Sequence, residues 1–248
     1  MLPHLRDRPL HMHRYPEGVE GPRFWQKQCP EHRPAWLPTV PVWSRDKRAN
    51  ISFCVVDELA ALLWAVIIGS IELHTSLHTR HALERPTTLA FDLDPGAGAN
   101  VVACTDVALR LRDLLTELDL QGVPKTSGSK GLQVYVPLNT PVTYEDTKPL
   151  ARKIAQVLEA KSPARVVSRM PKALRAGKVL VDWGQNTPHK SMVCAYSVRA
   201  KARPTVSTPL RWRRSRPSRR RATPRSSRSS STTCSRASTP TATSSPAS

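Results

Sequence analysis

The segment Phe91-Asp92-Leu93-Asp94-Pro95-Gly96 carries the clearest structural signal in this 248-residue chain. The residues around it are mainly apolar and a Pro-Gly pair follows, so a strand is predicted over 88–94. Side chains two residues apart on a strand point to the same face, so Asp92 and Asp94 project together at the strand's end. Two carboxylates this close repel each other unless a cation lies between them, which predicts an oxygen-ligand site for Mg²⁺ or Mn²⁺.

A third carboxylate, Asp182, lies in a second apolar segment, predicted as a strand over 178–183. A lone Asp inside such a strand is costly to bury without a partner. Together with Asp92 and Asp94 it supplies enough ligands for two metal ions, one activating a 3′-hydroxyl and one neutralising a triphosphate. Simpler interpretations stay open: a solvated turn for the Asp pair, and an edge-strand polar residue for Asp182. Metal-dependent glycosyltransferases also use an Asp-x-Asp pair.

The remaining pattern predicts an α+β domain. An amphipathic helix is expected over 106–118 and an alternating strand over 132–136. Thr143, followed by an Asp three residues later, resembles a capping box that opens another helix. Residues 1–50 lack a sustained period and are expected to form extended segments and loops. Strands interleaved with helices predict a mixed sheet flanked by helices, in a domain that covers residues 1–210.

Charge divides the chain into two parts. The net charge is +19, and residues 211–248 hold ten Arg and no Asp or Glu. This Arg/Ser/Thr/Pro-rich tail cannot bury enough apolar surface to fold, so it is expected to be disordered. It is either a basic arm that binds phosphates or the product of a reading-frame shift in a GC-rich gene. Residues 1–210 are basic as well, which favours a polyanionic partner such as nucleic acid.

The compartment is predicted from cysteine spacing and hydropathy. The five cysteines are scattered, so neither a disulfide framework nor a Cys-rich zinc site is expected, and a reducing cytoplasm is the simplest location. The N-terminus lacks the apolar core of a signal peptide. The most apolar stretch, 59–71, is shorter than the roughly 20 residues that span a bilayer. It is expected to be a buried helix, and no membrane association is predicted.

A small-residue loop at 125–131, Lys-Thr-Ser-Gly-Ser-Lys-Gly, fits a phosphate site. Small residues let backbone N–H groups approach phosphate, and Lys130 supplies charge. The Walker A spacing is absent, and a simple glycine turn is the alternative. Arg199 follows a predicted strand and can clamp a phosphate with two hydrogen bonds, although a lone Arg is usually a solvated surface residue.

These segments occur with other recognisable blocks: Arg8-Pro9-Leu10, Arg14-Tyr15-Pro16-Glu17-Gly18-Val19, Phe24-Trp25-Gln26-Lys27, Ile71-Glu72-Leu73-His74, Gly177-Lys178-Val179-Leu180-Val181-Asp182 and Ala195-Tyr196-Ser197-Val198-Arg199. In this order they resemble the polymerase domain of bacterial ATP-dependent DNA ligase D, of the archaeo-eukaryotic primase superfamily. The resemblance implies a primase–polymerase catalytic core. It implies nucleotide addition to DNA 3′ ends with overhangs or gaps during non-homologous end joining, with ribonucleotides and Mn²⁺ preferred. Nucleoside triphosphates, a Ku-like protein and a DNA ligase are the partners it implies.

The resemblance also implies roles for individual residues. Asp92, Asp94 and Asp182 match metal-binding carboxylates. The positions that match the nucleotide site are His74, beside the sugar, and Ser127, Lys130, Gln133 and Arg199, along the triphosphate. The positions assigned to DNA are Arg14, Phe24, Trp25 and Lys27, of which the aromatic pair packs against DNA; base stacking on aromatics makes that role physically reasonable.

Departures from the family pattern predict altered activity. Gln133 replaces a histidine; glutamine cannot carry charge, so weaker triphosphate binding and slower catalysis are expected. His13 replaces a lysine that recognises a 5′-phosphate, which would soften the preference for phosphorylated ends. The family's leading helical segment is missing and its closing segment is replaced, which would expose apolar surface. The alternative to an active polymerase is a catalytically impaired or inactive DNA-end-binding homologue.

Overall fold

The computed structural model describes residues 1–44 and 47–212, and its central element is a five-stranded mixed sheet. In spatial order the strands are β11 (Val166–Val167), β12 (Val179–Asp182), β8 (Thr88–Pro95), β10 (Leu132–Pro137) and β9 (Val123–Thr126). Only β11 and β12 are parallel. The strands predicted over 88–94, 132–136 and 178–183 are therefore confirmed, and the α+β prediction with them.

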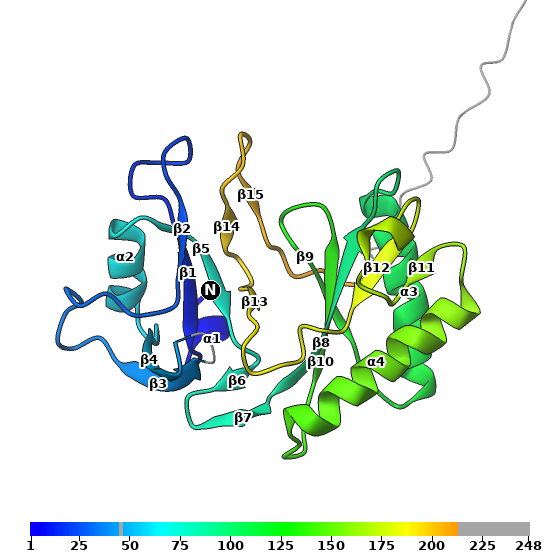
Figure 1. Ribbon diagram of the computed structural model, residues 1–248, viewed down its shortest axis with the longest axis horizontal. Helices are drawn as coiled ribbons and strands as arrows, with labels where there is room; N and C mark the ends of the chain where they lie inside the picture. Colours follow the sequence, from blue (N-terminus) through cyan, green and yellow to red (C-terminus); the bar gives the residue numbers. More distant parts are fainter. Residues whose placement is uncertain (45–46, 213–248) are drawn as a thin grey trace, which may run out of the picture. The chain divides into compact units, whose positions relative to one another are not determined.

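Two long helices, α3 (Val101–Glu117) and α4 (Tyr144–Lys161), cover one face of this sheet (Figure 1). Their apolar sides pack on Leu89, Phe91 and Leu93 of β8 to form the largest core. The helix predicted at 106 begins five residues earlier, because the Asn100 side chain accepts hydrogen bonds from two backbone N–H groups of the first turn. The predicted Thr143 capping box at the start of α4 is present.

A second, four-stranded antiparallel sheet is built largely from the N-terminal residues. Its strands, in order, are β13 (Met192–Val193), β5 (Ser70–Thr75), β1 (Leu10–Arg14) and β2 (Phe24–Gln26). The expectation of extended segments and loops over 1–50 is thus incomplete, because the extended segments pair as strands. In β1, apolar Leu10 and Met12 face a core and alternate with histidines that face the other side. The sequence did not reveal this alternation, because histidine between apolar residues is not a typical outward-facing residue of a short strand.

The smaller elements extend or connect these sheets. They are α1 (Leu2–Leu5), α2 (Leu59–Ile67), the 3₁₀ turn η1 (Lys172–Leu174), and three hairpins: β3 (Thr39–Ser44) with β4 (Ala49–Cys54), β6 (His78–Thr79) with β7 (Ala82–Pro86), and β14 (Val198–Arg199) with β15 (Thr205–Val206). Downstream of β15, Trp212 donates from its indole to the carbonyl of Gly122 and packs against the core of the large sheet. The rest of the predicted tail, residues 213–248, lies outside the described residues.

The helix expected to be buried is half exposed. In α2 only Ala61 and Ala65 are buried, whereas Ile67 is 81% exposed. Asp57 does not cap it, because its carboxylate accepts the N–H of Asp7 and pairs with Arg80. None of the helices in the described part of the chain has the length and hydropathy needed to cross a membrane.

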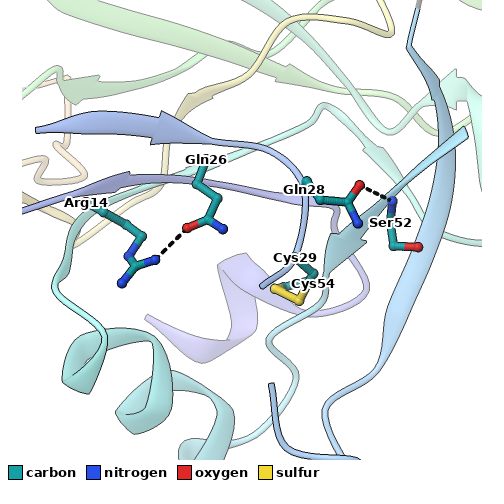
Figure 2. The surroundings of a disulfide bond; sticks show 6 residues. All are labelled: Arg14, Gln26, Gln28, Cys29, Ser52 and Cys54. Carbon is teal, nitrogen blue, oxygen red and sulfur yellow. Dashed lines mark hydrogen bonds between the residues drawn. A yellow bond between two sulfur atoms is a disulfide. The ribbon is translucent and has the colours of Figure 1, made fainter. Parts of the chain in front are cut away.

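Cys29 and Cys54 form a disulfide, which corrects the expectation that no cysteines pair (Figure 2). Their separation of 25 residues gave no signal; the two residues meet because the segment after β2 lies against β4. There the N–H of Cys29 donates to the carbonyl of Ser52, and the N–H of Ser52 donates to the Gln28 side chain. The disulfide therefore fastens the exit of β2 to the β3–β4 hairpin.

Candidate active site

Four polar residues form one row across the five-stranded sheet. Asp92, in the central strand, lies opposite Asp182 of β12 on one side and opposite Gln133 of β10 on the other. Gln133 in turn lies opposite Lys125 of β9. Residues directly opposite on paired strands project from the same face, and Asp94, two residues after Asp92, joins them. The strand register therefore brings the three predicted metal-binding positions onto the face not covered by helices.

Burial and mutual repulsion disfavour negative charge in this row. Burial raises the pKa of Asp92, and the charges of Asp94 and Asp182 raise it further, to about 7, against a smaller opposing effect of the hydrogen bond from Gln133. Burial and the charge of Asp182 also raise the pKa of Asp94. A pair of carboxyl groups in this state is suited to a divalent cation, which removes the repulsion, and oxygen donors favour Mg²⁺ or Mn²⁺.

The Asp182 carboxylate is held by its own turn. One oxygen accepts the N–H of Gly184 at 2.8 Å and the other accepts the Gln185 side-chain amide at 2.8 Å. The Asn186 side chain fixes this turn to β8 by bonding both the N–H and the carbonyl of Ala90. Over residues 1–44 and 47–212, no three His, Cys, Asp or Glu side chains are arranged as a metal site. Asp182 thus shares the face of the Asp pair without being assembled with it as a three-ligand set.

A cavity of about 260 Å³ lies over the Asp pair. It contains every position predicted for the nucleotide. The lining residues are His74, Asp92, Asp94, Ser127, Ser129, Lys130, Gln133, Gln185, Ser191, Met192, Val193 and Arg199. Carboxylates therefore form one wall while Lys130 and Arg199 supply positive charge to the others, which is the charge distribution that a metal-bound polyphosphate requires.

The loop between β9 and β10 is fixed by Ser127. Its hydroxyl accepts the N–H groups of Ser129 and Gly131, both at 3.2 Å, and donates to the Gly131 carbonyl. A Cβ on Gly131 would lie 2.0 Å from the carbonyl oxygen of Leu93, so only glycine permits this approach to β8. The hydroxyl of Ser127 shapes the loop, and Ser129 and Lys130 line the cavity.

Gln133 is oriented by neighbours on its own face. Its amide nitrogen donates to the Asp92 carboxylate at 3.1 Å, and its amide oxygen accepts the Tyr135 hydroxyl at 3.4 Å. On the next strand, the Lys125 amino group donates to Val193 O and to the Ser207 hydroxyl. Burial lowers the pKa of Lys125 to about 7. Gln133 therefore contacts a predicted metal ligand directly.

The second sheet and the β14–β15 hairpin supply the opposite wall of the cavity. His74 projects from β5, and Arg199 of β14 donates to the carbonyl of Ser127 at 3.2 Å. Both also contact the buried carboxylate of Glu72, at 3.5 and 3.1 Å respectively. The Arg199 contact is an ion pair by distance and not an aligned hydrogen bond. Arg199 is therefore not a solvated surface residue.

The residues predicted to contact DNA divide between the two faces of the second sheet. Trp25 is 53% exposed, stacks on His13 with ring centroids 4.4 Å apart, and approaches His74 edge-on at 4.7 Å. Exposed Phe24 lies opposite Arg14, whose guanidinium sits over its ring. Arg14 also bonds Gln26, as Figure 2 shows, and the carbonyl of Ile68.

Lys27 lines a separate, smaller cavity of about 140 Å³ beside the β3–β4 hairpin. Trp25 contacts His74, which lines the cavity over the Asp pair.

Sequence reasoning missed two residues with direct roles in this arrangement. Gln185 lines the cavity and holds Asp182, but a lone glutamine after a strand carries no pattern of its own. Glu72 was part of a quoted block without an assigned role. Its one available signal was a glutamate inside the otherwise apolar run Ile71-Glu72-Leu73, since a carboxylate buried in a strand needs partners.

Sequence comparison assigns this architecture to a class of nucleic-acid enzymes. A family model described as "LigD, primase-polymerase domain" matches residues 1–230. The chain belongs to this family, and the resemblance stated from its motifs is confirmed.

Particular relatives cover most of the chain. It is 39% identical over 221 residues to the multifunctional non-homologous end joining DNA repair protein LigD of Mycobacterium tuberculosis. It is 37% identical over 214 residues to LigD of Mycolicibacterium smegmatis. These matches cover 86% of this chain but only 29% and 28% of those proteins. Among solved structures, it matches the polymerase domain from M. tuberculosis ligase D in complex with DNA. The TM-score is 0.81 at 37% identity, covering 87% of this chain and 77% of that one.

Proposed function

We propose that this chain is a polymerase that adds ribo- or deoxyribonucleotides to the 3′ ends of broken DNA during non-homologous end joining. One observation carries the proposal: Asp92 and Asp94 share a cavity with Lys130, His74 and Arg199, between two sheets. The family membership supports a nucleotidyltransferase, and the similar solved domain holds DNA.

Asp92, Asp94 and Asp182 are proposed to hold two Mn²⁺ or Mg²⁺ ions. The donor set fits hard divalent cations, because the row offers carboxylate oxygens, and the pKa of Asp92 is raised by burial together with the charges of Asp94 and Asp182. Bound ions would supply a lowered pKa for the attacking 3′-hydroxyl and charge neutralisation for the triphosphate. Asp182 is assigned this role because it lies opposite Asp92 in the strand register, although its carboxylate is now bound by Gly184 and Gln185.

The nucleotide is proposed to lie along the positive side of the cavity. Lys130 and Arg199 would bind its phosphate oxygens, with Arg199 preoriented by Ser127 and Glu72. The loop fixed by Ser127 presents backbone at the same wall. His74 would stand beside the sugar, where ring contact with Trp25 limits its movement.

DNA is proposed to approach from the second sheet. The exposed rings of Phe24 and Trp25 offer stacking surfaces, and stacking on an aromatic contributes about 1–3 kcal/mol per base. Arg14 supports Phe24, and Lys27 extends positive charge along the same chain segment. Trp25, which touches His74, would place the DNA end next to the incoming nucleotide.

The biological setting is proposed from the names of the relatives, which describe non-homologous end joining and DNA repair. Because the chain spans under a third of those proteins, a DNA ligase and a Ku-like end-binding protein are proposed as partners and not as parts of this domain. The reaction would take place in the cytoplasm, on the bacterial chromosome.

Reduced turnover is proposed as a consequence of Gln133. The Gln133 amide donates one N–H to Asp92 and accepts from Tyr135, which leaves one uncharged N–H for a phosphate. Gln133 therefore serves mainly to hold the Asp92 carboxylate and contributes little to nucleotide binding.

Primer extension tests the proposal. A labelled primer–template with a short overhang is incubated with Mn²⁺ and each nucleoside triphosphate in turn, and the products are separated by length. Extension that Asp92→Ala abolishes supports the polymerase. DNA binding without extension in the parent protein would instead make the chain an end-binding homologue without turnover.

A further inference from the structure

Glu72 is a buried carboxylate at which several predicted functional residues meet. It is 3% exposed in β5, and one of its oxygens, Oε2, lies 3.1 Å from Arg199 Nε, 3.5 Å from His74 Nε2 and 3.6 Å from His13 Nδ1. The other oxygen accepts the N–H of Ala200 at 3.0 Å. Three side chains from three strands thus share a single oxygen atom.

One side of this cluster leads to the predicted DNA surface. Trp25, His13 and Glu72 lie opposite one another across β2, β1 and β5 and form a row on one face of the second sheet. The Trp25 and His13 rings are nearly parallel, at 7°, and the Tyr15 hydroxyl lies 3.1 Å from the same His13 nitrogen that faces Glu72. A DNA base that stacks on Trp25 would therefore restrain the His13 ring, which contacts Glu72.

The other side leads to the nucleotide cavity. Arg199 reaches from Glu72 to the Ser127 carbonyl, and His74 lines the same cavity. The backbone of the β14 segment is tied to the cluster through the Ala200 N–H and through the Ser197 hydroxyl, which accepts the N–H of Leu73. A shift of the carboxylate would thus move the side chain and the backbone that face the triphosphate.

The Glu72 carboxylate stays ionised at neutral pH. Burial alone would raise the pKa of Glu72, but the His74 hydrogen bond, the Arg199 charge and the Ala200 N–H together lower it to about 2. Burial lowers the pKa of both His13 and His74, although contact with Glu72 opposes this. The carboxylate is the shared negative charge of the cluster, and Arg199, His74 and His13 all face the same oxygen.

We infer that Glu72 is a positioning residue that couples DNA-end binding at Trp25 and His13 to nucleotide binding at Arg199 and His74. Occupation of one site fixes the shared carboxylate and so prepares the other. Coupling is reciprocal, so nucleotide must tighten DNA binding by the same factor as DNA tightens nucleotide binding. This inference rests on the proposed polymerase function.

The test measures this coupling as a ratio of affinities. A fluorescent duplex with a 3′-dideoxy primer end and a template overhang is titrated with the full chain in Mn²⁺, with and without the complementary nucleoside triphosphate. In the parent chain the nucleotide is expected to tighten DNA binding about 5-fold or more. In Glu72→Gln, which keeps the shape and the Ala200 contact but loses the charge, the ratio is expected to fall to about 1.

Two further variants separate coupling from folding. Glu159→Gln is the matched control, because Glu159 also accepts a backbone N–H and a hydroxyl, from Ser168, but lies on α4 away from the cavity. It should keep the parent ratio. If Glu72→Gln fails to unfold cooperatively, His13→Gln breaks the DNA side of the cluster alone and should also lower the ratio.

The outcomes distinguish the two proposals. A parent ratio retained in folded Glu72→Gln, or in His13→Gln, overturns the coupling and leaves the polymerase intact. A parent chain that binds no nucleotide and extends no primer overturns the proposed function, and the coupling with it.

Discussion

Asp182 lies directly opposite Asp92 on a neighbouring antiparallel strand, yet both of its carboxylate oxygens are bound by its own turn. Asp182 therefore lies next to the Asp pair in the strand register, but its carboxylate is hydrogen-bonded to Gly184 and Gln185. In this arrangement Gly184 and Gln185 compensate a charge that a metal would otherwise compensate.

Metal binding should stabilise the folded chain. A ligand that binds only the folded state at 100 times its Kd adds about 2.7 kcal/mol to the free energy of unfolding. We expect Mn²⁺ to raise the Tm in thermal unfolding, and Asp94→Asn to lose most of that rise. Ca²⁺-free and chelator-treated protein gives the baseline. An equal rise in Asp94→Asn would mean that Mn²⁺ binds elsewhere.

The metal-free protein should lose stability as the pH rises. The folded pKa of Asp92, about 7, exceeds its unfolded value, so between these two values the folded state binds more protons than the unfolded state. The free energy of unfolding should then fall from about pH 4 to pH 7 through this group. Asp92→Asn, which can still accept from Gln133, should be more stable than the parent at pH 8, by on the order of 2 kcal/mol. Urea unfolding in chelator at pH 5 and pH 8 measures this, and a parent that is the more stable of the two at pH 8 would contradict it.

Replacing Gln133 with histidine should restore phosphate affinity. A histidine can donate from one nitrogen to Asp92 and, when protonated, offer a charged donor, and hydrogen bonds to charged groups contribute about 1.5–3 kcal/mol. Gln133→His is expected to lower the KM for the nucleoside triphosphate about tenfold in primer extension. Gln133→Ala, which removes both hydrogen bonds, serves as the comparison. A Gln133→His variant that extends primers no faster than the parent would show that the family histidine is not missed here.

Reduction of the Cys29–Cys54 disulfide should destabilise the N-terminal sheet. A crosslink that closes a loop of this size contributes roughly 3 kcal/mol by loop entropy. Dithiothreitol is expected to lower the Tm of the parent and to leave a Cys29→Ser, Cys54→Ser double variant unchanged. The buried free thiols of Cys104 and Cys194 are present in both proteins and so cancel. Equal sensitivity in the double variant would mean that the effect of dithiothreitol does not come from the Cys29–Cys54 disulfide.

The sequence predicts β8, β10 and β12 of the large sheet because they are apolar or alternating runs with clear ends, whereas β9 (Val-Pro-Lys-Thr) and β11 (Val-Val) have no such pattern. Phe91 to Gly96 is the best case: the strand and the shared face of its two carboxylates follow from a period of two. Strand register does not follow from that period, so the contact of Gln133 with Asp92 could not be derived from the sequence.

The second sheet and the cysteines are hidden from sequence reasoning for a different reason. In β1, His11 is buried and His13 is half-buried, and the Glu72 carboxylate that faces His13 lies more than 50 residues away. Partners at such separation leave no local pattern. The same holds for Cys29 and Cys54, and for α2, whose apolar residues are largely solvent-exposed.

Primer extension by Asp182→Asn at saturating Mn²⁺ tests the two-metal site most directly, because Asp182 is the acid that the structure holds apart. We expect kcat to fall by about 100-fold or more, equivalent to about 2.7 kcal/mol of transition-state stabilisation, with unchanged affinity for the DNA end. An Asp182→Asn protein that extends primers as fast as the parent would contradict it.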